Sequence, residues 1–159
     1  MADSPKDVVR KFFAEFGQSV EQDEQTYRKY LAEDVQYFTG TTMVRSVDEL
    51  LALVRKASDM IGLKTWRAEI LNIIAEGDIV VSERIDHQIG LNDEEAFPTV
   101  NLGIMKIKDG KIVEWRDYWD PRELMEYGER YRAEKGVSAK YGDALGGASK
   151  AAIEASEKD

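Results

Sequence analysis

Cysteine is absent from this 159-residue sequence, and histidine occurs once, as His87. Without thiols the chain cannot form disulfides, thiolate metal sites or a cysteine nucleophile. A single imidazole excludes metal sites built from several histidines, and any Ser-His-Asp chemistry would have to use His87. Whatever chemistry the chain performs must therefore rest on carboxylates, tyrosines and arginines, and no bound metal is expected.

Long apolar runs and clustered positive charge are also missing. No stretch approaches the roughly 20 apolar residues that span a bilayer, and the first residues, MADSPKDVVR, lack the pattern of a secretory signal. The chain has 31 acidic and 22 basic residues, for a formal net charge of −9, whereas nucleic acids and anionic membranes attract basic surfaces. We therefore expect a cytoplasmic protein without nucleic-acid or membrane partners. No glycine-rich phosphate loop is present, so no cofactor is expected.

The apolar pattern divides the chain into helical segments, a block of strands and a last helix. Apolar residues at helical spacing predict helices over about 5–17, 21–32, 47–61 and 121–134. Alternating patterns separated by turn residues predict strands over about 64–75, 79–89, 98–108 and 111–119. The stretch 35–40 reads as irregular.

Local signals mark several ends of these elements. Ser4 before a proline, the capping box 46–49 and the run Asp120-Pro121-Arg122-Glu123 are typical of helix starts. Asp109-Gly110 predicts a two-residue hairpin turn, because both residues tolerate positive φ. The third helix is expected to bury Leu50, Leu51, Val54, Met60 and Ile61.

Helices followed by antiparallel hairpin strands and a closing helix indicate an α+β domain. A curved sheet wrapped around the helices would leave one deep pocket for a small molecule. We expect this domain to span residues 1–135. Residues 136–159, rich in Gly, Ala, Ser and Lys, have little to bury and predict a polar, frayed or weakly helical tail.

Two of the predicted strands carry charged residues on faces that should be buried. In the strand 79–89, Arg84 and Asp86 point the same way, about 7 Å apart at ~3.4 Å per residue. In the strand 111–119, Asp117 shares a face with Trp115 and Trp119. Buried carboxylates are costly unless paired, and one guanidinium can bind two of them. We therefore expect an Asp86–Arg84–Asp117 cluster inside the pocket.

This cluster admits two interpretations. Two carboxyl groups held by one arginine in an apolar pocket suit acid–base catalysis, because unequal surroundings separate their pKa values. A structural ion-pair network would give the same spacing, which by itself favours neither interpretation. Tyr37 could add a hydroxyl to the pocket or serve as a half-buried core residue. His87 falls on the face opposite Asp86 and is expected to be structural or exposed.

The outer face of the same strand carries a stripe of apolar residues, formed by Ile79, Val81, Ile85 and Ile89. Such a stripe is too apolar to remain in contact with water. We therefore expect a homodimer built on the outer face of the sheet.

At these residues the chain resembles the limonene-1,2-epoxide hydrolase family of the SnoaL-like and NTF2-like superfamily. The similarity runs from about Val8 to Leu124 and is strongest in SERIDH (82–87) and NLGIMKIKDGKIVEWRDYWDPREL (101–124). The resemblance implies an NTF2-like cone, in which a curved mixed β-sheet carries helices packed on its concave side, and it implies a dimer.

The resemblance also implies roles at the matching positions. Asp117, within WRDYW, corresponds to the general base that deprotonates water, Asp86 to the acid that protonates the epoxide oxygen, and Arg84 to the group that orients both. Tyr37 matches a tyrosine that helps to hold the water. Thr39 stands where the family has an asparagine as a further water ligand, and the proline-rich loop that follows in the family is absent.

The function implied is cofactor-independent hydrolysis of a hydrophobic epoxide, terpene-like or aryl, to a diol in one step. Trp115 and Met105 are expected to line the pocket around this substrate. A lyase, an isomerase or a polyketide-type cyclase using the same pocket is the alternative, which the loss of the asparagine favours. A non-catalytic binding module is a third reading, against which a buried Asp–Arg–Asp set argues.

Overall fold

The computed structural model describes residues 3–136. The helices are α1 (Pro5–Ala14), α2 (Val20–Tyr30), α3 (Val47–Ile61) and α4 (Arg122–Glu134). The strands are β1 (Leu31–Phe38), β2 (Met43–Val44), β3 (Leu63–Glu76), β4 (Ile79–Gly90), β5 (Glu95–Lys108) and β6 (Lys111–Trp119). Residues 137–159 of the expected tail lie outside the described residues.

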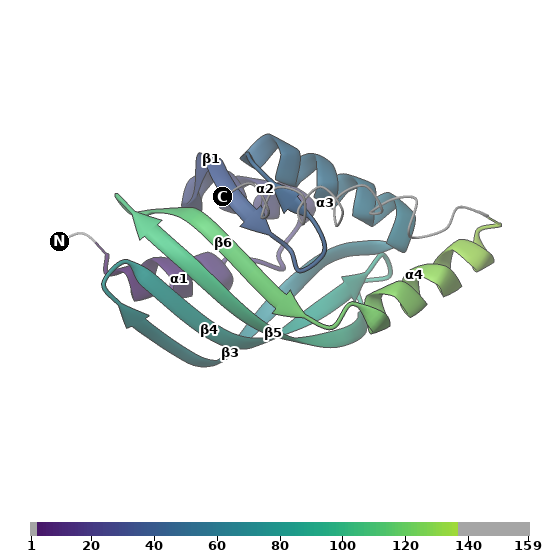
Figure 1. The fold of residues 1–159 in the computed structure, drawn as a ribbon. Helices are drawn as coiled ribbons and strands as arrows, with labels where there is room; N and C mark the ends of the chain where they lie inside the picture. Colours follow the sequence, from purple (N-terminus) through teal and green to yellow (C-terminus); the bar gives the residue numbers. More distant parts are fainter. Residues whose placement is uncertain (1–2, 137–159) are drawn as a thin grey trace, which may run out of the picture.

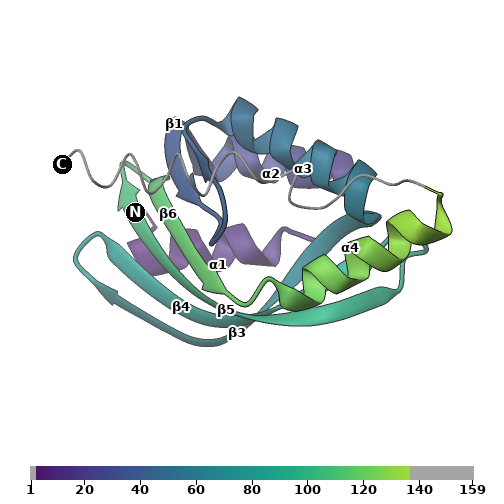
Figure 2. The same ribbon diagram turned by 45° about the vertical axis from the view of Figure 1, so that its right-hand side comes forward.

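The strands form one curved mixed sheet in the order β2-β1-β6-β5-β4-β3, which does not close into a barrel. The pairs from β3 to β6 are antiparallel hairpins, and β1 joins β6 in parallel. Helices α1, α2 and α3 lie over the inner side of the sheet, and α4 extends from the end of β6 (Figures 1 and 2). The expected α+β architecture, a curved mixed sheet with helices on its concave side, is therefore confirmed.

Local sequence signals explain where most elements begin and end. The hydroxyl of Ser4 accepts a hydrogen bond from the backbone of Asp7, and the hydroxyl of Ser46 accepts one from Glu49, so both serines cap helices as expected. Asp109 and Gly110 both have positive φ, at 50° and 73°, and join β5 to β6 in a tight hairpin.

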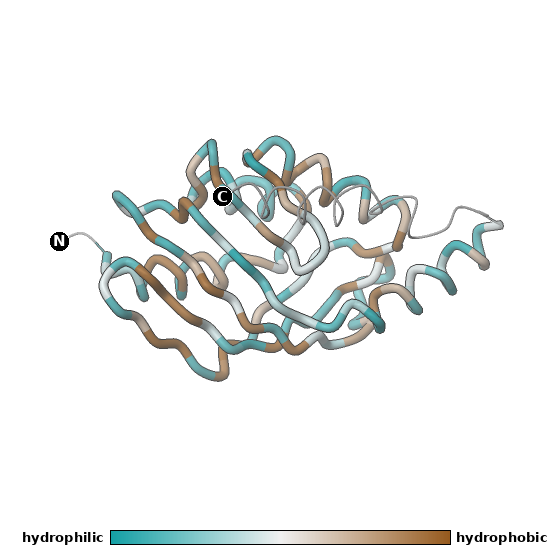
Figure 3. The backbone as a smooth tube through the Cα atoms, viewed as in Figure 1, coloured by the Kyte–Doolittle hydropathy of each residue, from teal (hydrophilic) through white to brown (hydrophobic). Residues whose placement is uncertain are grey.

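The core lies between the inner face of the sheet and the helices. Phe12 and Phe13 of α1 are buried and contact Trp115 of β6 edge to face, with ring centroids 5.2 and 6.2 Å apart. Val80 and Met105 extend this core along β4 and β5. Figure 3 shows that apolar residues follow the strands as well as the helices. The packed core occupies one part of the concavity and leaves the rest for a cavity.

The structure corrects the expectations for 35–40 and for two apolar side chains. Residues 35–38 belong to β1, because Gln36, Tyr37 and Phe38 pair with β6. Val54 is 36% exposed because its side of α3 borders the cavity. Ile89, expected on the outer stripe, is only 7% exposed and lies beside a shift in the β4–β5 register.

The start of α4 also differs from expectation. Pro121 occupies the N-cap position without a side-chain hydrogen bond, and the Asp120 carboxylate accepts instead from the backbone of Arg122 at 3.0 Å. No helix within residues 3–136 is long and apolar enough to cross a bilayer.

Candidate active site

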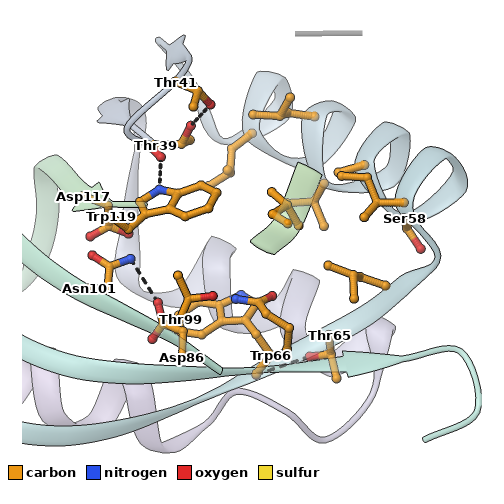
Figure 4. A pocket seen from close by; sticks show the side chains of 18 of the residues that line it. Thr39, Thr41, Ser58, Thr65, Trp66, Asp86, Thr99, Asn101, Asp117 and Trp119 are labelled. Atoms are coloured by element: carbon orange, nitrogen blue, oxygen red, sulfur yellow. Dashed lines mark hydrogen bonds between the residues drawn. The ribbon is translucent and has the colours of Figure 1, made fainter. Parts of the chain in front are cut away.

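A cavity of about 220 Å³ lies between the sheet and the helices that cover it. One wall is apolar and comes mainly from α3 and the segments beside it, with Leu50, Leu53, Met60, Ile61, Leu63 and Leu124. The inner face of the sheet supplies the polar wall, where Asp86, Thr99, Asn101 and Asp117 lie close together (Figure 4). Such a cavity suits a small, largely apolar molecule with a few polar contacts.

Arg84 joins the two aspartates in this wall, as the alternation of the strands predicts. Its Nε donates to Oδ1 of Asp86 at 2.8 Å, and its Nη2 donates to Oδ2 of Asp117 at 2.7 Å. Arg84 is 0% exposed, Asp86 5% and Asp117 2%. The predicted cluster is therefore confirmed as a geometric arrangement, and its burial strengthens each charge-assisted bond.

Asp117 is held by two further donors. The indole Nε1 of Trp115 donates to Oδ1 at 2.6 Å, and the hydroxyl of Tyr37 donates to Oδ2 at 3.3 Å. Tyr37 also stacks on Trp115 with ring centroids 4.2 Å apart. Because β1 pairs with β6 at Tyr37 and Trp115, backbone register and ring stacking fix both donors toward the carboxylate.

Aromatic rings surround the Arg84 guanidinium. Its central carbon lies 4.6 Å from the centre of the Phe13 ring and 5.9 Å from the rings of Trp66 and Trp115. Cation–π contacts of this kind stabilise a guanidinium that is removed from water. The arginine is thus fixed from both sides, by rings and by carboxylates.

Burial and charge set the protonation of this cluster. Burial raises the pKa of Asp86 to about 6, although Arg84 opposes the shift and Asp117 adds to it. Burial would lower the pKa of Arg84, but the two carboxylates outweigh it and raise that pKa, so the guanidinium stays charged. Burial, with the charge of Asp117, also raises the pKa of Tyr37, which remains a hydroxyl donor. Asp86 can therefore carry a proton close to neutral pH.

The remaining predicted site residues divide into two groups. Tyr37 and Thr39 line the cavity, and the Thr39 hydroxyl accepts from the backbone of Thr42 at 3.2 Å. Trp115 and Met105 do not line the cavity, contrary to expectation, because both belong to the packed core, where Phe12 and Phe13 of α1 contact Trp115. They are each 1% exposed, and Trp115 contacts Asp117 from the core side.

His87 lies on the outer face, as the alternation predicts. Its Nδ1 is 2.9 Å from a carboxylate oxygen of Glu95, and its Nε2 is 3.2 Å from one of Glu69. Within residues 3–136 no three His, Cys, Asp or Glu side chains are grouped to hold a metal ion.

Sequence reasoning missed several residues of the polar wall. Asn101 donates from Nδ2 to Oδ2 of Asp86 at 3.1 Å, and Thr99 is the cross-strand partner of Asp86. Trp119 also lines the cavity and donates to the backbone carbonyl of Thr39. The alternation of β5 would have placed Thr99 and Asn101 on one face, but only the register with β4 shows that this face meets Asp86.

This arrangement brings a protonatable carboxyl, a fixed cation and a hydrogen-bonded carboxylate to one cavity wall. Proton transfer to one atom of a substrate and from another is the chemistry that these groups support. The family model of the limonene-1,2-epoxide hydrolase catalytic domain matches residues 3–130.

Solved structures with the same fold are similar to this chain at low sequence identity. An LEH-like epoxide hydrolase from M. tuberculosis is 24% identical, with a TM-score of 0.59 over 85% of this chain and 96% of the other. An NTF2-like protein of unknown function from Burkholderia pseudomallei K96243 is 18% identical, with a TM-score of 0.64 over 79% and 98%. A protein proposed to be a SnoaL-like polyketide cyclase, from Jannaschia sp. CCS1, is 17% identical, with a TM-score of 0.60 over 80% and 96%. These similarities show that the chain has the NTF2-like fold that the resemblance implies.

Proposed function

This chain belongs to the limonene-1,2-epoxide hydrolase family, and from that premise we propose that it is a cofactor-independent epoxide hydrolase. The substrate is an epoxide with an apolar body, terpene-like or aryl, and the product is a vicinal diol. The observation that carries this proposal is Arg84 bridging two buried carboxyl groups, one of them with a pKa near 6, on the wall of a mainly apolar cavity.

The reaction needs a base for water and an acid for the epoxide oxygen. Asp117 takes a proton from water as the water oxygen attacks an epoxide carbon. As the C–O bond of that carbon breaks, Asp86 gives its proton to the leaving oxygen. The attack and the protonation occur in one step, and no bond forms between enzyme and substrate.

The charges of the cluster remain balanced through this step. Before reaction, Arg84 carries a positive charge, Asp117 a negative charge and Asp86 a proton. Afterwards the proton lies on Asp117 and the negative charge on Asp86, so the guanidinium faces one carboxylate in both states. Arg84 therefore holds both carboxyl groups in place while the charge moves from one to the other. The proton must return from Asp117 to Asp86 before the next turnover.

One observation favours a second candidate, a lyase, isomerase or polyketide-type cyclase. The Thr39 hydroxyl already accepts from Thr42 and lies 3.3 Å from the Thr41 hydroxyl, so it is engaged within its own turn. A water bound at Asp117 would then have Tyr37 as its main additional ligand. In this candidate reaction Asp117 removes a proton directly from a substrate carbon or hydroxyl, while Asp86 protonates an oxygen.

Product analysis with a panel of limonene, cyclohexene and stilbene oxides distinguishes the two candidates. We expect diol formation by the native chain and a loss of at least 10²-fold in kcat for Asp117→Asn and Asp86→Asn. Glu83→Gln is the matched control, since Glu83 lies on β4 but bonds Asn72 on the outer face. Loss of substrate without diol would favour the second candidate, and binding without turnover would contradict both.

A further inference from the structure

Gln88 of β4 brings an amide to the cavity that makes no hydrogen bond of its own. Its side chain lies on the inner face with Arg84 and Asp86, because alternate residues of a strand face the same side, and it lines the cavity. Neither polar atom of the amide has a hydrogen-bond partner within residues 3–136, and neither is among the unpartnered atoms that are buried. The half-buried amide is therefore open to a molecule in the cavity.

The polar side chains beside Gln88 on the neighbouring strand β3 are engaged with other residues. The hydroxyl of Thr65 donates to the carboxylate of Asp23, and the ammonium of Lys64 pairs with the carboxylate of Asp93. Both Thr65 and Lys64 line the cavity. Because the positive charge of Lys64 is already balanced, this part of the wall favours a neutral polar group over a carboxylate.

The spacing along β4 relates the amide of Gln88 to the proton donor. Two residues of a strand span about 7 Å at ~3.4 Å per residue, and Asp86 and Gln88 point to the same side. A ligand that receives the proton of Asp86 on one oxygen therefore reaches the amide with a second polar group about 7 Å away. Between these two points Trp66, the cross-strand partner of Gln88, adds an aromatic surface to the cavity wall.

The chemistry of the amide favours a hydroxyl or a carbonyl as the second polar group. One end of a glutamine amide donates hydrogen bonds and the other accepts them, and turning the amide over exchanges the two ends without removing either. A hydroxyl can bond to both ends, and a carbonyl can bond to the donating end. An apolar group at this position would displace water from the amide without replacing its hydrogen bonds, which lowers affinity.

We propose that Gln88 determines specificity and that the substrate is an epoxide with a hydroxyl or carbonyl group about 7 Å from its oxirane oxygen. This inference rests on the proposed function and narrows its substrate class. The amide of Gln88 binds this group, and the oxirane oxygen then lies at Asp86. The rest of the substrate is apolar and contacts the facing wall, which includes Leu53 and Ile61.

The test compares 3,4-epoxycyclohexylmethanol with 4-vinylcyclohexene oxide, which carries a vinyl group in place of the hydroxymethyl group. We expect kcat/KM to be at least about fivefold higher for the alcohol, the effect of one hydrogen bond. Gln88→Met, which keeps an unbranched side chain but removes the amide, should reduce this ratio toward one. Gln25→Met is the matched control, because Gln25 is exposed on α2, and it should keep the ratio. A ratio of one in the native chain, or a ratio that Gln88→Met leaves unchanged, would overturn the inference.

A third compound, 3,4-epoxycyclohexanecarboxylate, tests whether charge selects the substrate instead. We expect its kcat/KM to be no higher than that of the alcohol, because Lys64 is paired with Asp93. A clear preference for the carboxylate would show that Lys64, and not Gln88, selects the polar group, and would also overturn the inference.

Binding measurements keep this inference separate from the proposed function. The affinities of the alcohol and the vinyl compound are measured from the fluorescence of Trp66 and Trp119, which line the cavity. If neither gives a diol, the proposed function is wrong, but tighter binding of the alcohol that is lost in Gln88→Met still supports the Gln88 site. Diol formation with equal kcat/KM leaves the proposed function standing and rejects the Gln88 site. Equal affinities, or no binding of either compound at millimolar concentration, would also reject it.

Discussion

Gly103 on β5 lies directly across from Asp117 on β6 and leaves room for its carboxylate beside Arg84. A Cβ atom at position 103 would lie 2.9 Å from Oδ1 of Asp117 and 2.5 Å from Nη1 of Arg84. Gly103 also pairs with Ser82, whose hydroxyl would lie 3.1 Å from the same Cβ. The absence of a side chain here is therefore a condition for the guanidinium to reach both aspartates.

Replacing Gly103 with alanine should disrupt the cluster. We expect Gly103→Ala to lower kcat by about 10²-fold or more, because small displacements of reacting groups are costly, and to destabilise the protein by ~1–3 kcal/mol through overpacking. Steady-state kinetics and thermal unfolding measure the two effects. Lys108→Ala is the control, since Lys108 is exposed at the end of the same strand. Full activity in Gly103→Ala would show that Arg84 need not occupy this space.

The sequence predicted the sheet from 63 to 119 well, because apolar alternation and turn residues are local signals. It missed β1, whose parallel partner β6 is more than 70 residues away and whose middle residues do not pair in register. Alternation also predicted the Asp86–Arg84–Asp117 cluster. Alternation could not distinguish the cavity wall from the packed core on the same face of the sheet. It therefore predicted that Trp115 and Met105 line the cavity, whereas both lie in the core. Gly103 and Asn101 acquire their roles only through cross-strand register.

The pH dependence of the reaction should follow the protonation of Asp86. Its pKa of about 6 reflects burial first, and the proposed mechanism needs the protonated form. We therefore expect kcat/KM, which reports the free enzyme, to fall about tenfold per pH unit above pH 6. A profile of initial rates from pH 4 to 9 checks this. A kcat/KM that stays constant from pH 6 to 8 would contradict the assignment of Asp86 as the acid.

Folding stability should depend on the same group. The pKa of Asp86 is about 6 in the folded protein against 3.8 for an unperturbed aspartate. Between these values the unfolded chain loses its proton first, so the contribution of Asp86 to stability falls as pH rises from about 4 to 6 and does not change further above pH 6. The raised pKa of Asp86 therefore lowers the free energy of unfolding at neutral pH by ~3 kcal/mol.

Asp86→Asn removes this titration. The difference in unfolding free energy between Asp86→Asn and the native chain is measured by urea unfolding at pH 3.5 and pH 7.5. We expect this difference to favour the variant by ~3 kcal/mol more at pH 7.5 than at pH 3.5. Asp120→Asn serves as the control, because Asp120 is solvent-exposed and its pKa is lowered by hydrogen bonds from Arg122. A difference between Asp86→Asn and the native chain that does not change with pH would contradict the raised pKa.

The outer face of the sheet remains the surface on which we propose a homodimer. Four large apolar residues on this face are well exposed: Ile74 (66%), Val100 (67%), Leu102 (45%) and Tyr118 (48%). Exposed apolar surface of this extent on one face marks an interface. Light scattering should give about twice the chain mass of 18.0 kDa. Val100→Lys should shift the protein to the monomer, whereas Val20→Lys, on α2, should not. A native chain that is monomeric at micromolar concentration would reject the dimer.

The last prediction separates the two ways in which Asp117 could act. As a nucleophile it would form an ester with the substrate, and one carboxylate oxygen would end in the diol. As a general base it would remove a proton from water, and the new oxygen of the diol would come from that water. Arg84, Tyr37 and Trp115 all donate to this carboxylate, which reduces its nucleophilicity. Hydrolysis of an ester would also need a second activated water, and His87, the single histidine, lies on the outer face bonded to Glu69 and Glu95.

A single turnover in oxygen-18 water, with enzyme in excess over epoxide, distinguishes them. We expect the label in the diol at the first turnover and none in the peptide that contains Asp117, both measured by mass spectrometry. Asp117→Asn is the control, because it should form neither labelled nor unlabelled diol at a comparable rate. An unlabelled first-turnover diol, with label entering Asp117 as the ester is hydrolysed, would show a covalent mechanism. In that case Arg84 would have to stabilise an ester intermediate and not a pair of carboxyl groups that exchange one charge.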